Sequence, residues 1–153
     1  MATDLENIQR LLERFKRPIP PGDNYQNRLA EEFELILNQR FTDYFLQICD
    51  IIDLTTDLTH MTRGSAGSSL ICYLLGITDV DPIKWNIPVA RFMNPLRDDL
   101  PDVDIDFEHH RQTEVMERVF HKWPGKTARL SNYVTYKEKS ARREAAKRLG
   151  ATG

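Results

Sequence analysis

The chain has 153 residues, of which 41% are hydrophobic and 29% charged, and its formal net charge is −2. This length and composition predict one globular domain with a single core and exclude a chain that is disordered throughout. Because no apolar run approaches the roughly 20 residues that span a bilayer, and the first residues lack a signal-like pattern, we expect a cytoplasmic protein with no membrane partner.

Charge is divided unevenly along the sequence. Residues 1–108 contain 10 Lys and Arg against 19 Asp and Glu, whereas residues 109–153 contain 11 against 4. A basic C-terminal part beside an acidic body could hold a polyanion next to a carboxylate metal site. On charge alone, a helix with a solvated basic face is the favoured explanation.

The first half of the sequence is mostly helical by pattern. A capping box at Thr3 and Glu6 predicts a helix over 4–16, the prolines of 18–21 end it, and apolar spacing predicts a second helix over 24–40. The aromatic run 44–48 predicts a short buried strand, followed by a helical turn or two over 49–56. The small polar residues of 60–69 predict a loop that opens an apolar helix, which runs to Gly76.

The second half contains the only strong strand signal. Three prolines make 77–100 a mostly irregular crossing, after which residues 102–107 alternate strictly between acidic and apolar side chains. Helix 109–122, a strand near 128–134 and helix 135–149 complete the prediction. We divide the chain into an N-terminal helix with a Pro-rich linker (1–22) and one domain (23–153).

Alternation over 102–107 places three carboxylates on one side of the predicted strand. These are Asp102, Asp104 and Asp106, and the opposite side carries Val103, Ile105 and Phe107. Like charges two residues apart repel unless a cation lies among them, and hard oxygen ligands at this spacing suit Mg²⁺ or Mn²⁺. The simpler alternative is an exposed edge strand whose acids face water.

Other metal sites fit the sequence poorly. An EF-hand loop starting at Asp102 would need Gly at its sixth position and Glu at its twelfth, where the chain has Phe107 and Thr113. The adjacent His109 and His110 point apart on a helix or a strand. Cys49 and Cys72 lie in apolar stretches without CxxC spacing, so we predict buried reduced thiols rather than a disulfide or a zinc site.

A candidate phosphate loop precedes the acidic stretch. Arg63, Gly64 and Ser65 open the predicted apolar helix, where small residues let backbone amides approach phosphate oxygens. Such a loop is more often an ordinary turn. Arg91 and Arg97 lie between it and the acids, and this order of phosphate loop, cations and carboxylates is what phosphoryl transfer requires.

Three motifs together resemble the C-family alpha subunit of bacterial DNA polymerase III. Arg63-Gly64-Ser65 with the segment 74–82 resembles the nucleotide-loop helix of that family, and residues 91–97 resemble its Arg-Phe-Leu-Asn-Pro-Glu-Arg segment. Residues 100–107 resemble its Pro-Asp-x-Asp-x-Asp-Phe motif. The resemblance covers about residues 24–150, and three motifs in the same order are highly specific.

The resemblance implies an α+β palm of the polymerase-beta nucleotidyltransferase type, with a small mixed sheet flanked by helices. By position, Asp102 and Asp104 would be catalytic and bind metal, with Asp106 a weaker ligand. The phosphate-binding residues would be Arg63, Gly64, Ser65, Arg91 and Arg97. Two Mg²⁺ ions, a dNTP, primer-template DNA and further polymerase or replisome subunits would be the cofactors and partners.

The chain departs from the family pattern at several positions. His60, Met61 and Thr62 replace the Gly-Pro-Gly that usually precedes the loop, and Ala90 and Leu96 replace glutamates. The later Lys-x-Asp-Phe segment with the third metal-binding aspartate does not occur in the 153 residues, nor do fingers, thumb or phosphoesterase regions. We therefore expect a palm fragment that binds Mg²⁺ and dNTP weakly and does not extend primers alone.

Two other functions fit the residues. A non-catalytic nucleic-acid-binding module would use the basic segment 111–148 to bind phosphates, leaving the acids incidental. A small nucleotidyltransferase would transfer a nucleotide to some other hydroxyl without a template. Salt-dependent duplex binding that is indifferent to Asp102 and Asp104 favours the first, and template-free label transfer favours the second.

Overall fold

The computed structural model describes residues 3–96, 99–131, 133 and 135–150. Within these residues the chain combines six α-helices with one two-stranded antiparallel sheet, rather than the expected mixed sheet. The helices are α1 (Asp4–Leu12), α2 (Asp23–Asn38), α3 (Thr42–Asp53), α4 (Leu70–Leu74), α5 (Gln112–Lys122) and α6 (Glu138–Arg148), and the strands are β1 (His60–Arg63) and β2 (Asp104–Phe107). No helix in these ranges has the length and apolar character needed to cross a membrane.

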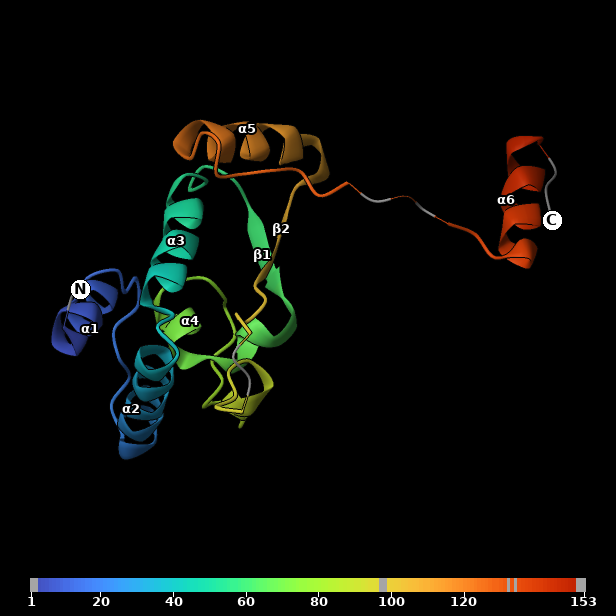
Figure 1. The fold of residues 1–153 in the computed structure, drawn as a ribbon. Helices are drawn as coiled ribbons and strands as arrows, with labels where there is room; N and C mark the ends of the chain where they lie inside the picture. The colour runs from blue at the N-terminus through green and yellow to red at the C-terminus, as the bar shows by residue number, and fades with distance from the viewer. Residues whose placement is uncertain (1–2, 97–98, 132, 134, 151–153) are drawn as a thin grey trace.

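The core is built around the short helix α4, which lies among α2, α3 and the connecting loops (Figure 1). Leu70, Ile71 and Leu74 of α4 are fully buried. They pack in one cluster with the apolar stripes of α2 and α3, and Leu11 of α1 belongs to the same cluster. Gly76 lies just beyond α4 with φ +74°, a left-handed conformation that glycine adopts without strain, as the sequence predicts.

The predicted strand over 44–48 is wrong. These residues lie inside α3, whose buried side chains Phe45, Ile48, Cys49 and Ile52 follow helical spacing. Five residues are too short a window to distinguish that spacing from a buried strand. Cys49 and Cys72 are buried free thiols, as expected, and burial raises the pKa of Cys49 to about 11.

Residues 60–69 are only partly the predicted loop. His60–Arg63 form β1, and the 3₁₀-helix η1 (Gly64–Ser68) then leads to Ser69, which caps α4. The strand expected near 128–134 is not found in the described residues of that stretch, and residues 132 and 134 lie outside the description. The remaining predicted helices are present with shifted ends.

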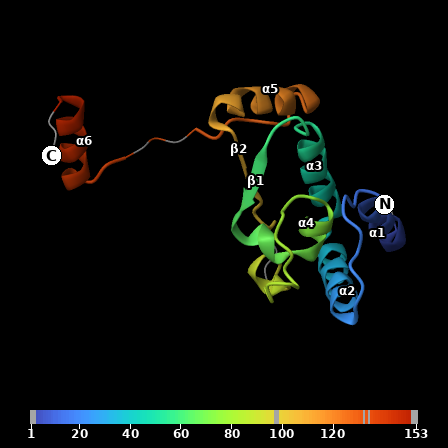
Figure 2. The ribbon, with the colours of Figure 1, turned by 180° about the vertical axis from the view of Figure 1, so that it is seen from behind.

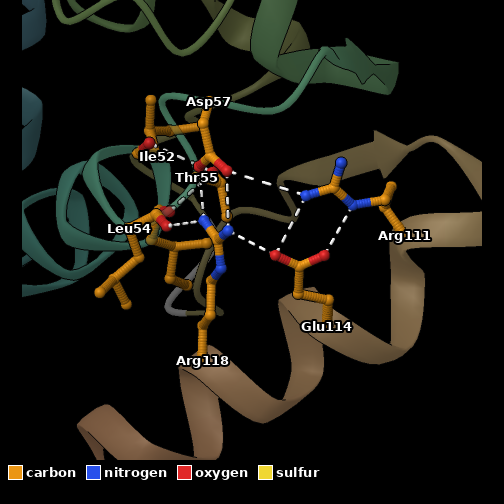
Figure 3. Close-up of polar contacts among 8 residues, drawn as sticks. Ile52, Leu54, Thr55, Asp57, Arg111, Glu114 and Arg118 are labelled. Carbon is orange, nitrogen blue, oxygen red and sulfur yellow. Dashed lines mark hydrogen bonds and ion pairs between the residues drawn. The ribbon is translucent and has the colours of Figure 1, made fainter.

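A polar network fixes α5 to the connection between α3 and β1 (Figure 3). Arg118 of α5 donates to the Leu54 carbonyl oxygen at 2.8 Å and to the Asp57 carboxylate at 2.5 and 2.7 Å. Glu114 accepts from both Arg118 and Arg111. Val115 is the only buried α5 residue in the described structure. We therefore infer that these polar contacts contribute much of the attachment of α5.

The helix α6 lies apart from the rest of the chain (Figures 1 and 2). It follows an extended segment, and none of its described residues is buried. Leu130 and Tyr133 in that segment are 95% and 93% exposed. The basic C-terminal part therefore forms an arm, defined here as residues 126–150, in which none of the described residues is buried.

Candidate functional site

The sheet brings the loop at 63–65 and the acidic stretch together. β1 and β2 pair antiparallel, with Arg63 opposite Asp104 and Met61 opposite Asp106. In this register Arg63, Asp104 and Asp106 share one face. The other face carries Ile105, which packs against the core, so one apolar and one acidic face is confirmed for β2.

Asp102 lies outside the strand, because β2 begins at Asp104, two residues later than predicted. An ordered contact holds the backbone before it: the Tyr44 hydroxyl of α3 donates to the Pro101 carbonyl oxygen. Burial raises the pKa of the Tyr44 phenol, and the negative charge of Asp102 adds to this rise. Tyr44 therefore positions the approach to β2, a role that the sequence alone did not indicate.

Gly64 lies close to the Asp104 side chain of β2. The φ of Gly64 is +76°, and a Cβ placed on it would lie 3.2 Å from Oδ2 of Asp104. A side chain at position 64 would therefore crowd that carboxylate as well as strain the backbone. Glycine lets the Asp104 carboxylate lie against the start of η1.

A cavity of about 300 Å³ is lined in part by Ser65, the residue after Gly64. Three of the residues predicted from the sequence line it, namely Ser65, Arg91 and Asp102. Arg91 comes from the 3₁₀-helix η2 (Val89–Arg91), whose following residue, Phe92, meets Phe45 of α3 edge to face. The remaining lining residues are Gln39, Phe41, Phe92, Met93, Asn94, Asp99, Leu100 and Pro101.

Arg63 points elsewhere. Its guanidinium forms a two-point ion pair with Asp106, with 3.0 Å between Nη2 and Oδ1. This hydrogen bond and the charge of Arg63 hold the pKa of the Asp106 carboxyl below its ordinary value. The pair is exposed on the acidic face of the sheet, and Arg63 is not among the residues that line the cavity.

Asp102 and Asp104 are the acids that remain available. Neither carboxylate has an ion pair with a residue in the described ranges, whereas Asp106 is held by Arg63. No group of three His, Cys, Asp or Glu side chains close enough to hold a metal ion occurs among the described residues. Arg97, a predicted phosphate ligand, lies outside the described residues.

Comparison with known proteins identifies the family. The family model described as the bacterial DNA polymerase III alpha NTPase domain matches residues 5–153. The chain belongs to this family.

Its curated relatives are much longer proteins. An error-prone DNA polymerase of Cutibacterium acnes is 37% identical over 152 residues, covering 97% of this chain and 13% of that protein. One from Sinorhizobium medicae is 35% identical over 156 residues, covering 97% and 14%. The DNA polymerase III subunit alpha of Mycobacterium tuberculosis is 37% identical over 138 residues, covering 88% and 12%. The chain thus spans a small fraction of the length of each of these relatives.

Proposed function

We propose that this chain supplies the nucleotide-binding part of a DNA polymerase palm and, within a larger assembly, helps transfer a nucleotide from a dNTP to a primer 3′-hydroxyl. The observation that carries the proposal is the cavity shared by Ser65, Arg91 and Asp102. Gly64, next to Ser65, lies close to the Asp104 carboxylate. Family membership supports the same reaction class. The palm fold of the polymerase-beta type is part of this proposal.

The phosphates of the dNTP would lie over η1. The Ser65 hydroxyl would donate a hydrogen bond to a phosphate oxygen, and Arg91, which lines the same cavity, would bring a cation. Arg97 would add positive charge as the leaving pyrophosphate develops. Arg63 would contribute less, because its guanidinium is committed to Asp106.

The carboxylates fit one divalent cation. Asp102 and Asp104 offer hard oxygen ligands without a competing ion pair in the described structure, which suits Mg²⁺. Bound there, Mg²⁺ would neutralise phosphate charge and lower the pKa of the attacking hydroxyl. A second ion needs further ligands, because two divalent cations about 4 Å apart repel strongly without more negative charge between them.

The proposal is tested by nucleotide binding to the 153-residue chain. We expect Mg²⁺-dependent binding of dATP in a calorimetric titration. Asp102→Asn and Asp104→Asn should each weaken Mg²⁺ binding by about tenfold or more, because each removes one of two anionic ligands. Asp106→Asn should have a smaller effect, since Arg63 already holds that carboxylate.

The matched control is Asp43→Asn, which removes an exposed carboxylate of α3 that pairs with Arg10 at the surface. It should leave the affinity for Mg²⁺ and dATP unchanged. If the Mg²⁺ affinities of Asp102→Asn and Asp104→Asn equal that of Asp43→Asn, then Asp102 and Asp104 bind no metal. That result would remove the basis for a polymerase site.

The basic arm favours a second candidate, a non-catalytic nucleic-acid-binding module. Four cations of the arm, Lys137, Lys139, Arg143 and Lys147, have no ion pair in the described structure, whereas Arg142 pairs with Glu138 and Arg148 with Glu144. If the arm binds phosphates, Arg143→Gln/Lys147→Gln should lower the salt dependence of duplex binding by a slope of up to about 2, at roughly 0.9 per phosphate contact. Arg142→Gln/Arg148→Gln removes the same charge from paired positions and should lower it less.

Fluorescence anisotropy of a labelled duplex, measured over a series of salt concentrations, decides between the candidates. The module alone predicts that Asp102→Ala and Asp104→Ala leave duplex binding unchanged and that dATP does not bind. Binding of dATP lost in Asp104→Ala rejects the module as the whole function.

A further inference from the structure

A buried ion pair on α2 contacts two segments that lead to the cavity. Glu32 is fully buried, and Arg28, one helical turn earlier, has a side chain 13% exposed. Nε of Arg28 donates to Oε1 of Glu32 at 2.8 Å. The nearest parts of the candidate site, η1 and the loop that leads to η2, are distant from both residues in the sequence.

The Glu32 carboxylate is an acceptor for the start of α4. Oε1 accepts from the Leu70 amide at 2.8 Å, and Oε2 accepts from the Ser69 hydroxyl at 2.7 Å and from the Ile71 amide at 3.0 Å. Burial raises the pKa of this carboxyl, and the hydrogen bonds from Ile71, Ser69, Leu70 and Arg28 oppose the rise. The contacts fix where η1 ends and α4 begins.

Arg28 extends the same attachment to a second segment. Its Nη2 donates to the Ser68 carbonyl oxygen at 2.9 Å and to the Ile87 carbonyl oxygen at 2.6 Å. Ser68 lies three residues after Ser65, and Ile87 lies four residues before Arg91. One guanidinium therefore joins the two segments that present Ser65 and Arg91 to the cavity.

Stability alone is a weak explanation for this arrangement. Removing two charges from water costs several kcal/mol per ion, and well-packed apolar side chains of similar volume often stabilise a protein as much or more. Apolar side chains could not hold two separate carbonyl groups and two amides in fixed directions. Directional hydrogen bonds to both segments indicate instead that the pair aligns the segment of Ser65 with the segment of Arg91.

We propose that Arg28 and Glu32 are positioning residues that set the placement of Ser65 relative to Arg91 in the nucleotide cavity. The expected effect of this pair on nucleotide binding rests on the proposed function. Its structural part, alignment of the two segments, is measured separately.

The test uses Glu32→Gln and Arg28→Lys in the full 153-residue chain. Gln offers one acceptor oxygen where the carboxylate has two, and Lys cannot donate to Glu32, Ser68 and Ile87 from a rigid planar fork. Glu34→Gln, an exposed carboxylate on the same helix, is the matched control. The readouts are the ¹H–¹⁵N shifts of the Ser65 and Arg91 amides, and calorimetric affinities for Mg²⁺ alone and for dATP with Mg²⁺.

We expect both amides to shift in Glu32→Gln and Arg28→Lys but not in Glu34→Gln. Affinity for dATP with Mg²⁺ should fall about tenfold, because misplaced ligand groups lose their joint contact with the phosphates. Affinity for Mg²⁺ alone should stay within about twofold, since Asp102 and Asp104 belong to segments that this pair does not touch. A merely structural pair would lower the unfolding temperature and leave folded-state shifts and affinities as they were.

Folded variants with unmoved Ser65 and Arg91 amides, or with unchanged dATP affinity, would overturn the inference. Should Glu32→Gln not fold, Arg28→Lys decides by the same criteria. If the unmodified chain binds no dATP, the proposed function fails, while the amide shifts still report whether the pair aligns the segments.

Discussion

Gly64 affects both the backbone conformation of the loop and the space around the Asp104 carboxylate. Its positive φ gives the chain a sharp entry into η1, and the missing side chain leaves room for the Asp104 carboxylate. Two effects of a substitution can therefore be separated: backbone strain, which any left-handed glycine shares, and crowding of the carboxylate, which belongs to this position.

We predict that Gly64→Ala lowers both stability and Mg²⁺ affinity. Strain at positive φ should cost about 1 kcal/mol of unfolding free energy. Displacement of Asp104 should weaken Mg²⁺ binding severalfold in a calorimetric titration. Gly125→Ala is the matched control, because Gly125 has φ +74° and no atom within 4 Å of the added Cβ. Identical Mg²⁺ affinities in the two variants would show that crowding at Asp104 does not matter.

At the scale of residues, the sequence predicted which side chains come together better than it predicted where each one points. Motif order named Ser65, Arg91 and Asp102, which do line one cavity. It could not predict that Arg63 turns to Asp106, because that choice depends on the register of two strands 40 residues apart. Tyr44 was missed because nothing local reveals that its hydroxyl reaches the Pro101 carbonyl oxygen.

At the scale of elements, long periodic segments were predictable and short ones were not. The helix expected over 24–40 is α2 (Asp23–Asn38), whose apolar stripe extends over four turns. β1 has four residues, and its conformation depends on pairing with β2 rather than on its own sequence. An isolated strand near 128–134 would have no partner to satisfy its backbone groups, which explains why propensity alone misled the prediction there.

The network of Asp57, Arg111, Glu114 and Arg118 gives α5 a pH-dependent attachment. Hydrogen bonds from Arg118 lower the pKa of the Asp57 carboxyl to about 2. A carboxyl with a depressed pKa stabilises the folded state while it is ionised in both states. Its contribution is therefore complete above its ordinary pKa near 4 and is lost as the pH falls toward about 2.

We predict that Asp57→Asn lowers the unfolding temperature at pH 7 and that the difference from the unmodified chain narrows below pH 4. Thermal melts followed by circular dichroism at several pH values measure this. Glu117→Gln, an exposed carboxylate of α5 outside the network, should show no comparable difference at pH 7. A gap between Asp57→Asn and the unmodified chain that stays constant from pH 7 to pH 2 would contradict ionisation of Asp57 as its cause.

At the scale of the whole molecule, the chain separates an acidic folded body from a basic arm. The body holds the cavity and both available carboxylates, and the arm exposes its cations without a buried anchor in the described structure. The sequence predicted an uneven charge between residues 1–108 and 109–153. The structure places the boundary later, because α5 is attached to the body. The charge of the arm does not predict its position on a bound duplex, because that position depends on specific contacts.

The proposed metal ligands, Asp102 and Asp104, also limit the reaction that the 153-residue chain is expected to catalyse. In the proposed site two Mg²⁺ ions would carry four positive charges and Asp102 and Asp104 would supply two negative ones. No group of three His, Cys, Asp or Glu side chains that could hold a metal ion occurs among the described residues. We predict that the 153-residue chain binds dATP with Mg²⁺ yet shows no templated primer extension on a denaturing gel. The control is Asp104→Ala, which should lose dATP binding as well. Templated extension by the unmodified chain that disappears in Asp104→Ala would refute this prediction, because it would mean that two carboxylates with the substrate phosphates suffice to hold both ions.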